Sequence, residues 1–210
     1  MIGWMIFLVL GGFVPDAQVS AEQRATADSE RCLDNSPQRN DAVVVTACSA
    51  LLERRGLLGS QVNMIKALRA RAYARQRDYR HAASDYRDAF RAGVWEPSVA
   101  NGLCWSLAVI GESLDEARVA CDARLREVPD DPETLDSRGL VSLKQGRFQD
   151  AWDDYNRAFR INPQGVSWLY GRGVAALRLG RSEEGRRDIE LAEMGYPGIG
   201  AMYASYGIRP

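Results

Sequence analysis

The sequence predicts an all-α fold in which about four helix-turn-helix units stack into a solenoid, with a capping helix at each end. Two observations lead to this prediction. The chain resembles itself at a spacing of about 34 residues, and glycine and proline recur where helices of that length would end. At 210 residues, with 46% hydrophobic and 26% charged residues, the composition is that of a globular protein able to bury a core.

The self-similarity is clearest in the C-terminal half. A shift by this spacing places Arg138-Gly139 on Arg172-Gly173 and Pro163 on Pro197. The same step backwards aligns Phe148 with Leu114, Ala151 with Ala117, Tyr155 with Cys121 and Pro163 with Pro129, and a step one residue longer then reaches Tyr79, Ala82 and Tyr86. Similarity at a fixed period of this length is the signature of a repeat architecture.

Each unit has the pattern of two antiparallel helices. In the clearest unit we expect a first helix over residues 133–145, a break at Gly146 and a second helix over 148–161. Gly139 costs about 1 kcal/mol relative to alanine inside a helix. Its recurrence at Gly173 therefore indicates a close approach of the partner helix. One helix pair cannot bury its own apolar surface, so neighbouring units must stack.

Residues 1–21 are expected to be a signal peptide. Residues 2–14 are apolar throughout, which is shorter than the roughly 20 residues of a membrane-spanning helix. Val19-Ser20-Ala21 then provides the small residues that a signal peptidase requires, and we expect cleavage after Ala21. Because no lysine or arginine precedes the apolar run, an uncleaved membrane anchor remains the alternative.

Four cysteines follow this segment, and their number and spacing predict two disulfides. The expected pairs are Cys32 with Cys48 and Cys104 with Cys121. Neither pair has the spacing of a zinc site, and His81, the only histidine, lies far from every cysteine in the sequence. Disulfides indicate an oxidising compartment such as a periplasm. Four reduced, buried cysteines are the alternative.

The chain is expected to divide into a signal peptide, two caps and four repeats. The predicted parts are residues 1–21, the signal peptide or anchor; 22–62, a polar segment followed by a capping helix; 63–97, 98–131, 132–165 and 166–197, the four units; and 198–210, a C-terminal cap with a short helix.

The net charge of the chain does not indicate a polyanionic partner. The 27 basic and 28 acidic residues give a net charge of -1, so no global field attracts nucleic acid or anionic lipid. All basic residues except Lys66 and Lys144 are arginines, which favour planar, forked contacts with carboxylates. Solvated helix faces are the alternative explanation of this bias.

The repeated positions resemble the tetratricopeptide repeat. The residues that carry the resemblance are Gly139 and Gly173 within the first helices, Tyr79 and Phe148 at the start of the second, Ala82, Ala117 and Ala151, then Ala158 and Ala192, and the closing prolines. The resemblance covers about residues 63–197 and implies a right-handed solenoid. The chain is also similar to exported bacterial tetratricopeptide proteins that carry a cysteine-bearing helix ahead of the repeats. Trp105 departs from the pattern, because a small residue is usual there.

The resemblance implies a binding surface on the concave side, formed by the first helix of each unit. The candidate binding residues on this side are Arg71, Arg75, Asp136, Lys144, Tyr170 and Arg178. Three of them, Arg75, Lys144 and Arg178, occupy equivalent positions, which predicts a basic stripe for an acidic or C-terminal carboxylate segment. Ordinary solvated charges on exposed helix faces are the alternative.

No catalytic constellation stands out in the sequence. His81 has no serine or cysteine motif beside it, and Gly171-Arg172-Gly173 lies inside a helical pattern and not after a strand. We therefore expect a non-catalytic periplasmic or secreted scaffold that binds an unidentified protein or peptide, without metal, cofactor or nucleic acid; the oligomeric state stays open. The alternatives are an inner-membrane-anchored accessory subunit of an envelope assembly or secretion complex, and a hydrolase with an unrecognised site.

Overall fold

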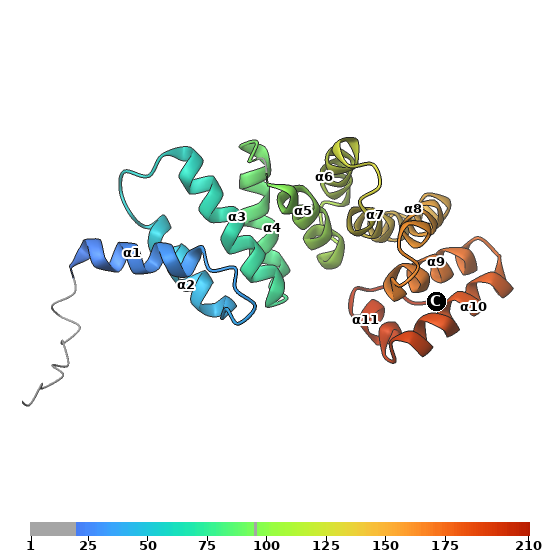
Figure 1. Ribbon diagram of the computed structural model, residues 1–210. Coiled ribbons are helices and arrows are strands. Elements are labelled where there is room, and N and C mark those ends of the chain that lie inside the picture. Colours follow the sequence, from blue (N-terminus) through green and yellow to red (C-terminus); the bar gives the residue numbers. More distant parts are fainter. Residues whose placement is uncertain (1–19, 95) are drawn as a thin grey trace, which may run out of the picture.

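The computed structural model describes residues 20–94 and 96–210, which form a curved array of helices (Figure 1). The helices are α1 (Ala21–Cys32), α2 (Asp41–Leu52), α3 (Gly59–Arg75), α4 (Tyr79–Arg91), α5 (Pro97–Ile110), α6 (Leu114–Glu127), α7 (Pro132–Lys144), α8 (Phe148–Ile161), α9 (Val166–Arg178), α10 (Ser182–Gly195) and α11 (Ile199–Ser205). Within the described ranges there are eleven helices and no strand. Successive helices pair from α1–α2 to α9–α10, and this confirms the predicted all-α solenoid.

The expected signal peptide lies outside the described residues, apart from Ser20 and Ala21. None of the helices in the part of the chain that the structure describes is both long and apolar enough to cross a bilayer.

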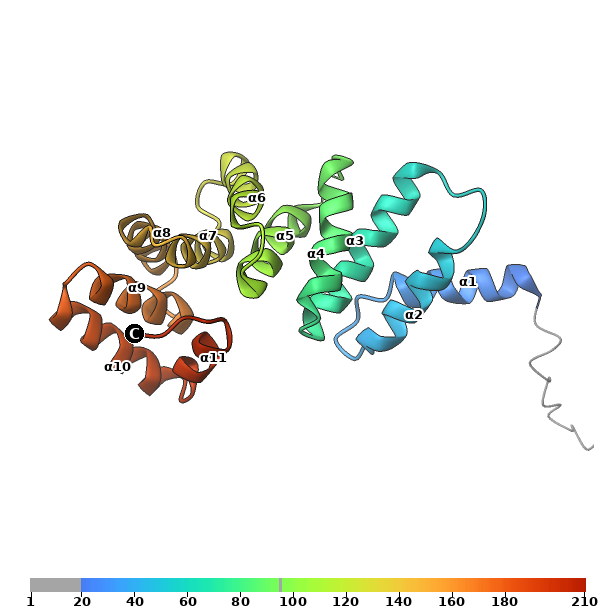
Figure 2. The same cartoon turned by 180° about the vertical axis from the view of Figure 1, so that it is seen from behind.

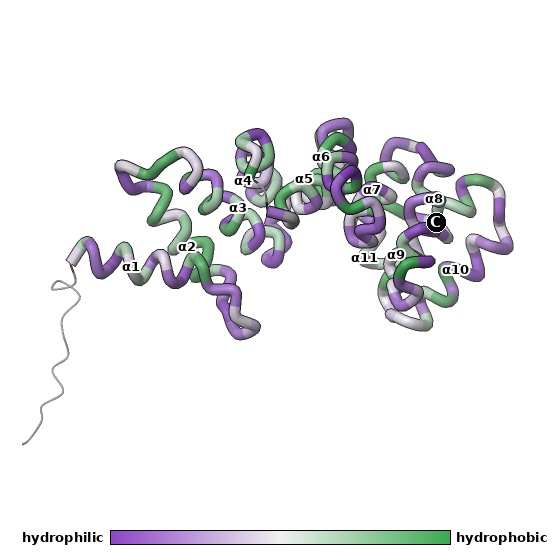
Figure 3. The backbone as a smooth tube through the Cα atoms, turned by 45° about the horizontal axis from the view of Figure 1, so that its top comes forward, coloured by the Kyte–Doolittle hydropathy of each residue, from purple (hydrophilic) through white to green (hydrophobic). Residues whose placement is uncertain are grey.

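The stretch before the first cysteine is a helix, α1, although the sequence analysis expected only a polar segment there. Ser20 and Gln23 form a capping box, in which each side chain accepts a hydrogen bond from the backbone N–H of the other residue. Cys32 is the one residue of α1 that is fully buried. Figure 3 shows α1 as largely hydrophilic and α2 as largely hydrophobic. The apolar stripe of α1 is therefore too weak to predict a helix from the sequence. The N-terminal cap and the disulfide of Cys32 stabilise this helix instead.

In the first, third and fourth repeat units the turn between the two helices contains one residue in the left-handed region, whereas the second unit has two, Gly111 (φ 73°) and Ser113 (φ 48°). Gly146 (φ 72°) and Gly180 (φ 79°) provide it in the last two units. Arg77 occupies the equivalent place in the first repeat with a φ of 61°, where an L side chain costs roughly 1–2 kcal/mol. The repeated glycines are thus explained by backbone geometry.

The helical glycines allow close contacts. A Cβ atom on Gly173 would lie 2.9 Å from the carbonyl oxygen of Gly185, so α9 and α10 meet there backbone to backbone. A Cβ on Gly139 would lie 2.8 Å from the ring of Tyr155, which also packs against Gly171 of the next unit. The close approach predicted from the recurring glycine is therefore confirmed, with a tyrosine ring filling the space in one unit.

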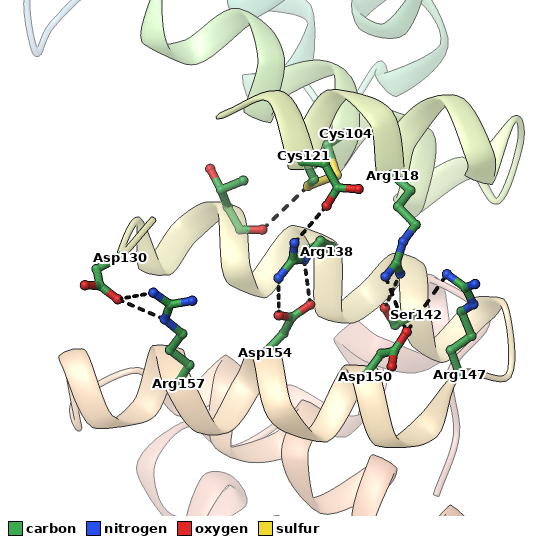
Figure 4. Close-up of polar contacts among 12 residues, drawn as sticks. Cys104, Arg118, Cys121, Asp130, Arg138, Ser142, Arg147, Asp150, Asp154 and Arg157 are labelled. Atoms are coloured by element: carbon green, nitrogen blue, oxygen red, sulfur yellow. Dashed lines mark hydrogen bonds and ion pairs between the residues drawn. A yellow bond between two sulfur atoms is a disulfide. The ribbon is translucent and has the colours of Figure 1, made fainter. Parts of the chain in front are cut away.

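A forked ion pair joins the two helices of three units, each time with the same sequence separation between the partners. The arginine on the first helix donates from Nε and Nη2 to both carboxylate oxygens of an aspartate on the second. The pairs are Arg69 with Asp85 (2.7 and 2.9 Å), Arg138 with Asp154 (2.9 and 2.6 Å) and Arg172 with Asp188 (2.7 and 2.9 Å). The aspartates are buried, and the paired geometry is the one in which arginine binds carboxylate most strongly. Figure 4 shows the pair in the third unit.

The second unit replaces this ion pair by a disulfide. A shift back by one repeat takes Arg138 to Cys104, Asp154 to Ala120 and Tyr155 to Cys121. Cys104 and Cys121 are bonded, with their Cα atoms 5.5 Å apart, so a covalent bond joins α5 to α6 at the level of the ion pairs (Figure 4).

The pair α1–α2 is joined in the same way by a disulfide between Cys32 and Cys48. Both predicted disulfides are therefore present in the structure, and each contributes on the order of 3 kcal/mol in the loop-entropy description. We call these five links, two disulfides and three ion pairs, the interhelical braces. Every helix pair from α1–α2 to α9–α10 has one.

Asp154→Asn is expected to lower the free energy of unfolding by about 2 kcal/mol, because it removes the buried carboxylate that accepts two hydrogen bonds from Arg138 and leaves that arginine with Asp122 as its one carboxylate partner. Urea denaturation followed by circular dichroism at pH 7 measures the change. Arg157→Ala is the matched control: its ion pair with Asp130 is exposed, and its loss is expected to cost at most about 1 kcal/mol. Equal costs for the two variants would show that the buried pair is no stronger than a surface one.

Candidate binding surface

The inner side of the array is formed by the first helices α5, α7 and α9, but α11 and the residues after it cover much of this side. Leu140 on α7 and Val174 on α9 are 1% and 2% exposed. In an array open on that side both would face solvent. They belong instead to one apolar cluster with Ile199, Tyr203 and Ile208. The C-terminal cap is therefore part of the inner surface as well as the end of the stack.

Helix α11 docks beside the beginning of α9. Tyr203 is buried and donates a hydrogen bond from its hydroxyl to the backbone carbonyl of Ser167 (2.8 Å). Its ring packs against Tyr170 with centroids 4.7 Å apart. The Glu193 carboxylate accepts hydrogen bonds from the backbone N–H groups of Gly198 and Gly200 and so fixes the turn between α10 and α11.

The residues after α11, Tyr206–Arg209, continue along the inner side, and we name them the C-terminal segment. Figure 2 shows the chain turning back from α11 across the last helix pair. Tyr206 makes an edge-to-face contact with Trp105 of α5, with centroids 5.6 Å apart. Arg178, at the end of α9, donates a hydrogen bond to the carbonyl oxygen of Arg209 (3.2 Å). The segment therefore links the second repeat unit to the fourth.

A cavity of about 500 Å³ lies beside the C-terminal segment, where α5, α7 and α9 end. Its apolar lining includes Leu114, Leu143, Phe148 and Val174, and the C-terminal segment forms another wall. Lys144 and Arg178 contribute cationic groups to the same lining. The lining is mixed, with polar and apolar surface in similar amounts, so the cavity offers both apolar contacts and cationic donors.

A group of buried polar atoms lies under α11. Asp136 is half-buried as a residue, but its Oδ1 has no contact with solvent and no hydrogen-bond partner among the described residues. Its Oδ2 accepts a long hydrogen bond from Ser167 Oγ (3.4 Å). Burial raises the pKa of this carboxyl from 3.8 to about 7. The hydroxyl of Tyr155 is likewise buried without a partner within the described part of the chain.

The six candidate binding residues do not form one continuous stripe. Lys144 and Arg178 share the cavity, Lys144 donating to the carbonyl of Val109 (3.0 Å). Two others are engaged elsewhere: Arg71 lies 4.0 Å from Glu96 and Arg75 lies 3.7 Å from Asp41. Burial lowers the pKa of Arg75, and the nearby Arg39 lowers it further. Asp136 and Tyr170 lie beside or beneath α11.

Sequence reasoning missed four residues of this surface: Trp105, Tyr203, Tyr206 and Ile208. Trp105 was identified only as a departure from the repeat pattern, although a large aromatic in place of a small residue on an inner helix indicates an additional partner. The alternation of apolar and polar residues after α11 was a second signal. Neither signal could predict the contact between Trp105 and Tyr206, because these two residues lie far apart in the sequence.

Other titratable groups offer little chemistry. His81 is exposed, and its Nδ1 lies 2.7 Å from the Asp78 carboxylate three residues earlier. Residues 20–94 and 96–210 contain no group of three or more histidine, cysteine or acidic side chains that could hold a metal ion.

The tetratricopeptide repeat family profile matches residues 137–195, which include most of the last two helix pairs. No curated protein matches the sequence at a significant level. Among solved structures, one described as MamA protein has 14% identity and a TM-score of 0.66, with 87% of this chain and 96% of that chain covered. A tetratricopeptide repeat protein from Parabacteroides merdae has 17% identity and a TM-score of 0.64, over 88% of this chain and 74% of that chain.

A third similar structure is YrrB, described as a tetratricopeptide protein with an unusual peptide-binding site. It has 17% identity and a TM-score of 0.61, with 78% of this chain and 82% of that chain covered. At these identities the likeness establishes the solenoid fold.

Asp136→Asn is expected to make the protein more stable than the wild type at pH 8 and to lose that advantage near pH 4. The Asp136 carboxyl ionises near pH 4 when unfolded and near pH 7 when folded. Its contribution to stability is therefore complete below about pH 4 and is lost as the pH rises to about 7, a loss on the order of 4 kcal/mol. The asparagine variant cannot ionise, so it is spared this loss.

Urea denaturation at pH 4.5, 6 and 8 measures the difference between the variant and the wild type. Asp153→Asn, an exposed carboxylate on α8, is the control and is expected to leave the pH profile of the wild type unchanged. Parallel pH profiles of the wild type and Asp136→Asn would contradict a buried, neutral carboxyl.

Proposed function

We propose a binding function for this chain from the premise that it is a tetratricopeptide repeat protein. In this proposal it is a non-catalytic scaffold that holds another protein or peptide on its inner surface. The observation that carries the proposal is the cavity of about 500 Å³ where three first helices end, whose lining combines apolar side chains with the cationic groups of Lys144 and Arg178. YrrB, which has a similar fold, is itself described as having a peptide-binding site.

The proposed site uses two of the six candidate residues directly. Lys144 and Arg178 already donate hydrogen bonds to backbone carbonyls, those of Val109 and Arg209. Both therefore present cationic donors that suit the carbonyls or a carboxylate of a bound segment. Arg71 and Arg75 are proposed to form a second, separate contact area beside α2, where their ion pairs at 4.0 and 3.7 Å are long enough to exchange for a ligand.

We also propose that the protein acts in an oxidising compartment outside the cytoplasm, the periplasm if the source is a Gram-negative bacterium. Two disulfides in a chain of this size support an exported protein, because thiols stay reduced in the cytosol. The apolar stretch of residues 2–14 supports the same destination.

A photo-reactive amino acid in place of Lys144 or Arg178 is expected to crosslink a specific partner in an extract of the source cells. The same group in place of Val119, which is 58% exposed on the second helix of its unit, is the control and is expected to capture nothing specific. Arg178→Glu should weaken partner binding by about tenfold, the equivalent of one charge-assisted hydrogen bond. Crosslinking from Val119 alone would place binding on the outer side and contradict the proposal.

The exported protein is expected to begin at Glu22 and to contain no free thiol. N-terminal sequencing and alkylation without reduction measure both properties. Cleavage after Ala21 would remove Ser20, the N-cap of α1, whose loss costs about 1 kcal/mol. The first turn of α1 should therefore exchange its amide hydrogens faster in the mature chain than in the uncleaved chain. A mature chain that retains residues 2–14 would favour the membrane-anchored accessory subunit, and four alkylatable thiols would contradict export.

A further inference from the structure

We propose that the disulfide between Cys32 and Cys48 is a redox latch: its exchange with an external dithiol releases helix α1 and leaves the repeat units folded. The latch lies at the N-terminal end of the array, away from the inner surface that carries the proposed function. The two disulfides then have different roles, because the bond between Cys104 and Cys121 stays closed as part of the repeat core.

Helix α1 depends on the disulfide for its place beside α2, at the edge of the array (Figure 1). Cys32 is its one fully buried residue, its other residues are half-buried or exposed, and five of its twelve residues are charged. At its other end, Arg54 donates an exposed hydrogen bond to the carbonyl oxygen of Ala21 (3.2 Å). A helix of this length is marginal in water by itself, so its attachments decide whether it forms.

Export would remove two supports of α1, if the mature chain begins at Glu22 as proposed above. Ser20 is the N-cap of this helix, and Ala21 provides the carbonyl oxygen that Arg54 binds. Cleavage after Ala21 removes both residues, and loss of an N-cap alone costs about 1 kcal/mol. The disulfide is then the attachment on which α1 depends.

A groove gives an external thiolate access to Cys32. A cavity of about 450 Å³ lies between the end of α1 and the first half of α3, and its lining includes Cys32, Leu33 and Met64. Leu33 and Met64 are 62% and 43% exposed, so the groove is open to solvent. Cys48, by contrast, is fully buried on α2. An attacking thiolate therefore meets the sulfur of Cys32, and Cys48 is the leaving group.

Opening of the latch takes two electrons, which the external dithiol supplies. Its thiolate forms a mixed disulfide with Cys32 and displaces Cys48 as a thiolate, which takes up a proton. The second thiol of the reagent loses its proton and displaces Cys32, which is protonated in turn. The reagent leaves as an intramolecular disulfide, and the protein keeps two thiols.

Helix α2 and the connection before it keep their place when α1 leaves. Arg69 of α3 donates a hydrogen bond to the hydroxyl of Ser49 (2.9 Å), so α2 stays tied to the first repeat. Within residues 33–40, Arg39 donates to the carbonyl oxygen of Ser36 (3.0 Å) and to the carboxylate of Asp41 (3.2 Å). This connection tethers the released helix close to α2, so that reoxidation closes the latch again.

Release of α1 changes the surface at the N-terminal end. Cys32 belongs to a small apolar cluster with Val44, Ala47 and Leu51, and this cluster is separate from that of the repeats. When α1 leaves, the part of the cluster that Cys32 covers becomes exposed beside the groove. The reduced protein therefore presents more apolar surface than the oxidised one.

The second disulfide lacks this access. Cys104 and Cys121 are both fully buried in the apolar cluster of the repeats. Helices α5 and α6 that carry them also pack against α4 and α7 on either side. An external thiolate reaches this bond when the stacked repeats open, which costs far more free energy than the release of one terminal helix.

The test titrates the purified, oxidised protein with dithiothreitol and follows each disulfide by differential alkylation and mass spectrometry. Hydrogen exchange of the same samples reports on α1 and on the repeats. A double variant, Cys32→Ser with Cys48→Ser, opens the latch without reductant. Cys104→Ser with Cys121→Ser is the matched control, because it removes the other disulfide.

The bond between Cys32 and Cys48 is expected to open at least about tenfold faster than the bond between Cys104 and Cys121. The amides of residues 24–32 should then exchange at least about tenfold faster, while those of α4–α10 keep their protection. The first double variant should show the same pattern without reductant, whereas the control should keep α1 protected. Binding of an apolar fluorescent dye should rise on reduction, and reoxidation should reverse both changes.

Protection of α1 that survives opening of the latch would overturn the proposal, because packing would then hold the helix. Equal rates of opening for the two disulfides would also overturn it, as would loss of protection across α4–α10 when the latch alone is open. If the first double variant does not fold, the titration of the natural protein decides between these outcomes. Partner crosslinking at Arg178 is measured separately, so either proposal can fail while the other stands.

Discussion

The structure depends on the interhelical braces, one per helix pair from α1–α2 to α9–α10. A helix pair in a solenoid contacts only its neighbours, so its internal angle has to be fixed locally. Three pairs fix it with an arginine fork on a buried aspartate and two with a disulfide. In both cases the linked residues are 16 or 17 apart, which places them opposite each other on antiparallel helices. Stacking of the braced helix pairs on one another then produces the curved array.

Replacing an ion pair by a disulfide has a further effect in the second unit. The tyrosine that follows the aspartate in the first and third units packs over a glycine of the next first helix, Tyr86 over Gly102 and Tyr155 over Gly171. Cys121 stands at that position in the second unit and fills much less space. Trp105 stands one repeat before Gly139, the glycine that packs against Tyr155 in the third unit, and its ring meets Tyr206. The most irregular unit is thus the one that receives the C-terminal segment.

Covering the inner surface changes the character of the candidate site. Charges on first helices would be simple ligand contacts in an open array, whereas Arg178 here holds the chain's own backbone and Asp136 lies beneath α11. The buried, partly unsatisfied group of Asp136 and Tyr155 costs stability where the cap docks.

The sequence by itself determined the repeat, the helix pairing and both disulfides, because these follow from spacings no longer than one repeat. The shift that superimposes the units also aligns the arginines and aspartates of the ion pairs. These interhelical braces could therefore also have been predicted from the sequence. Helix α1 escaped prediction because a cap and a disulfide hold it in place of an apolar stripe. Only the tertiary structure decided that the inner surface is covered. That contact joins Tyr206 to Trp105, and no periodic pattern relates residues so distant in the chain.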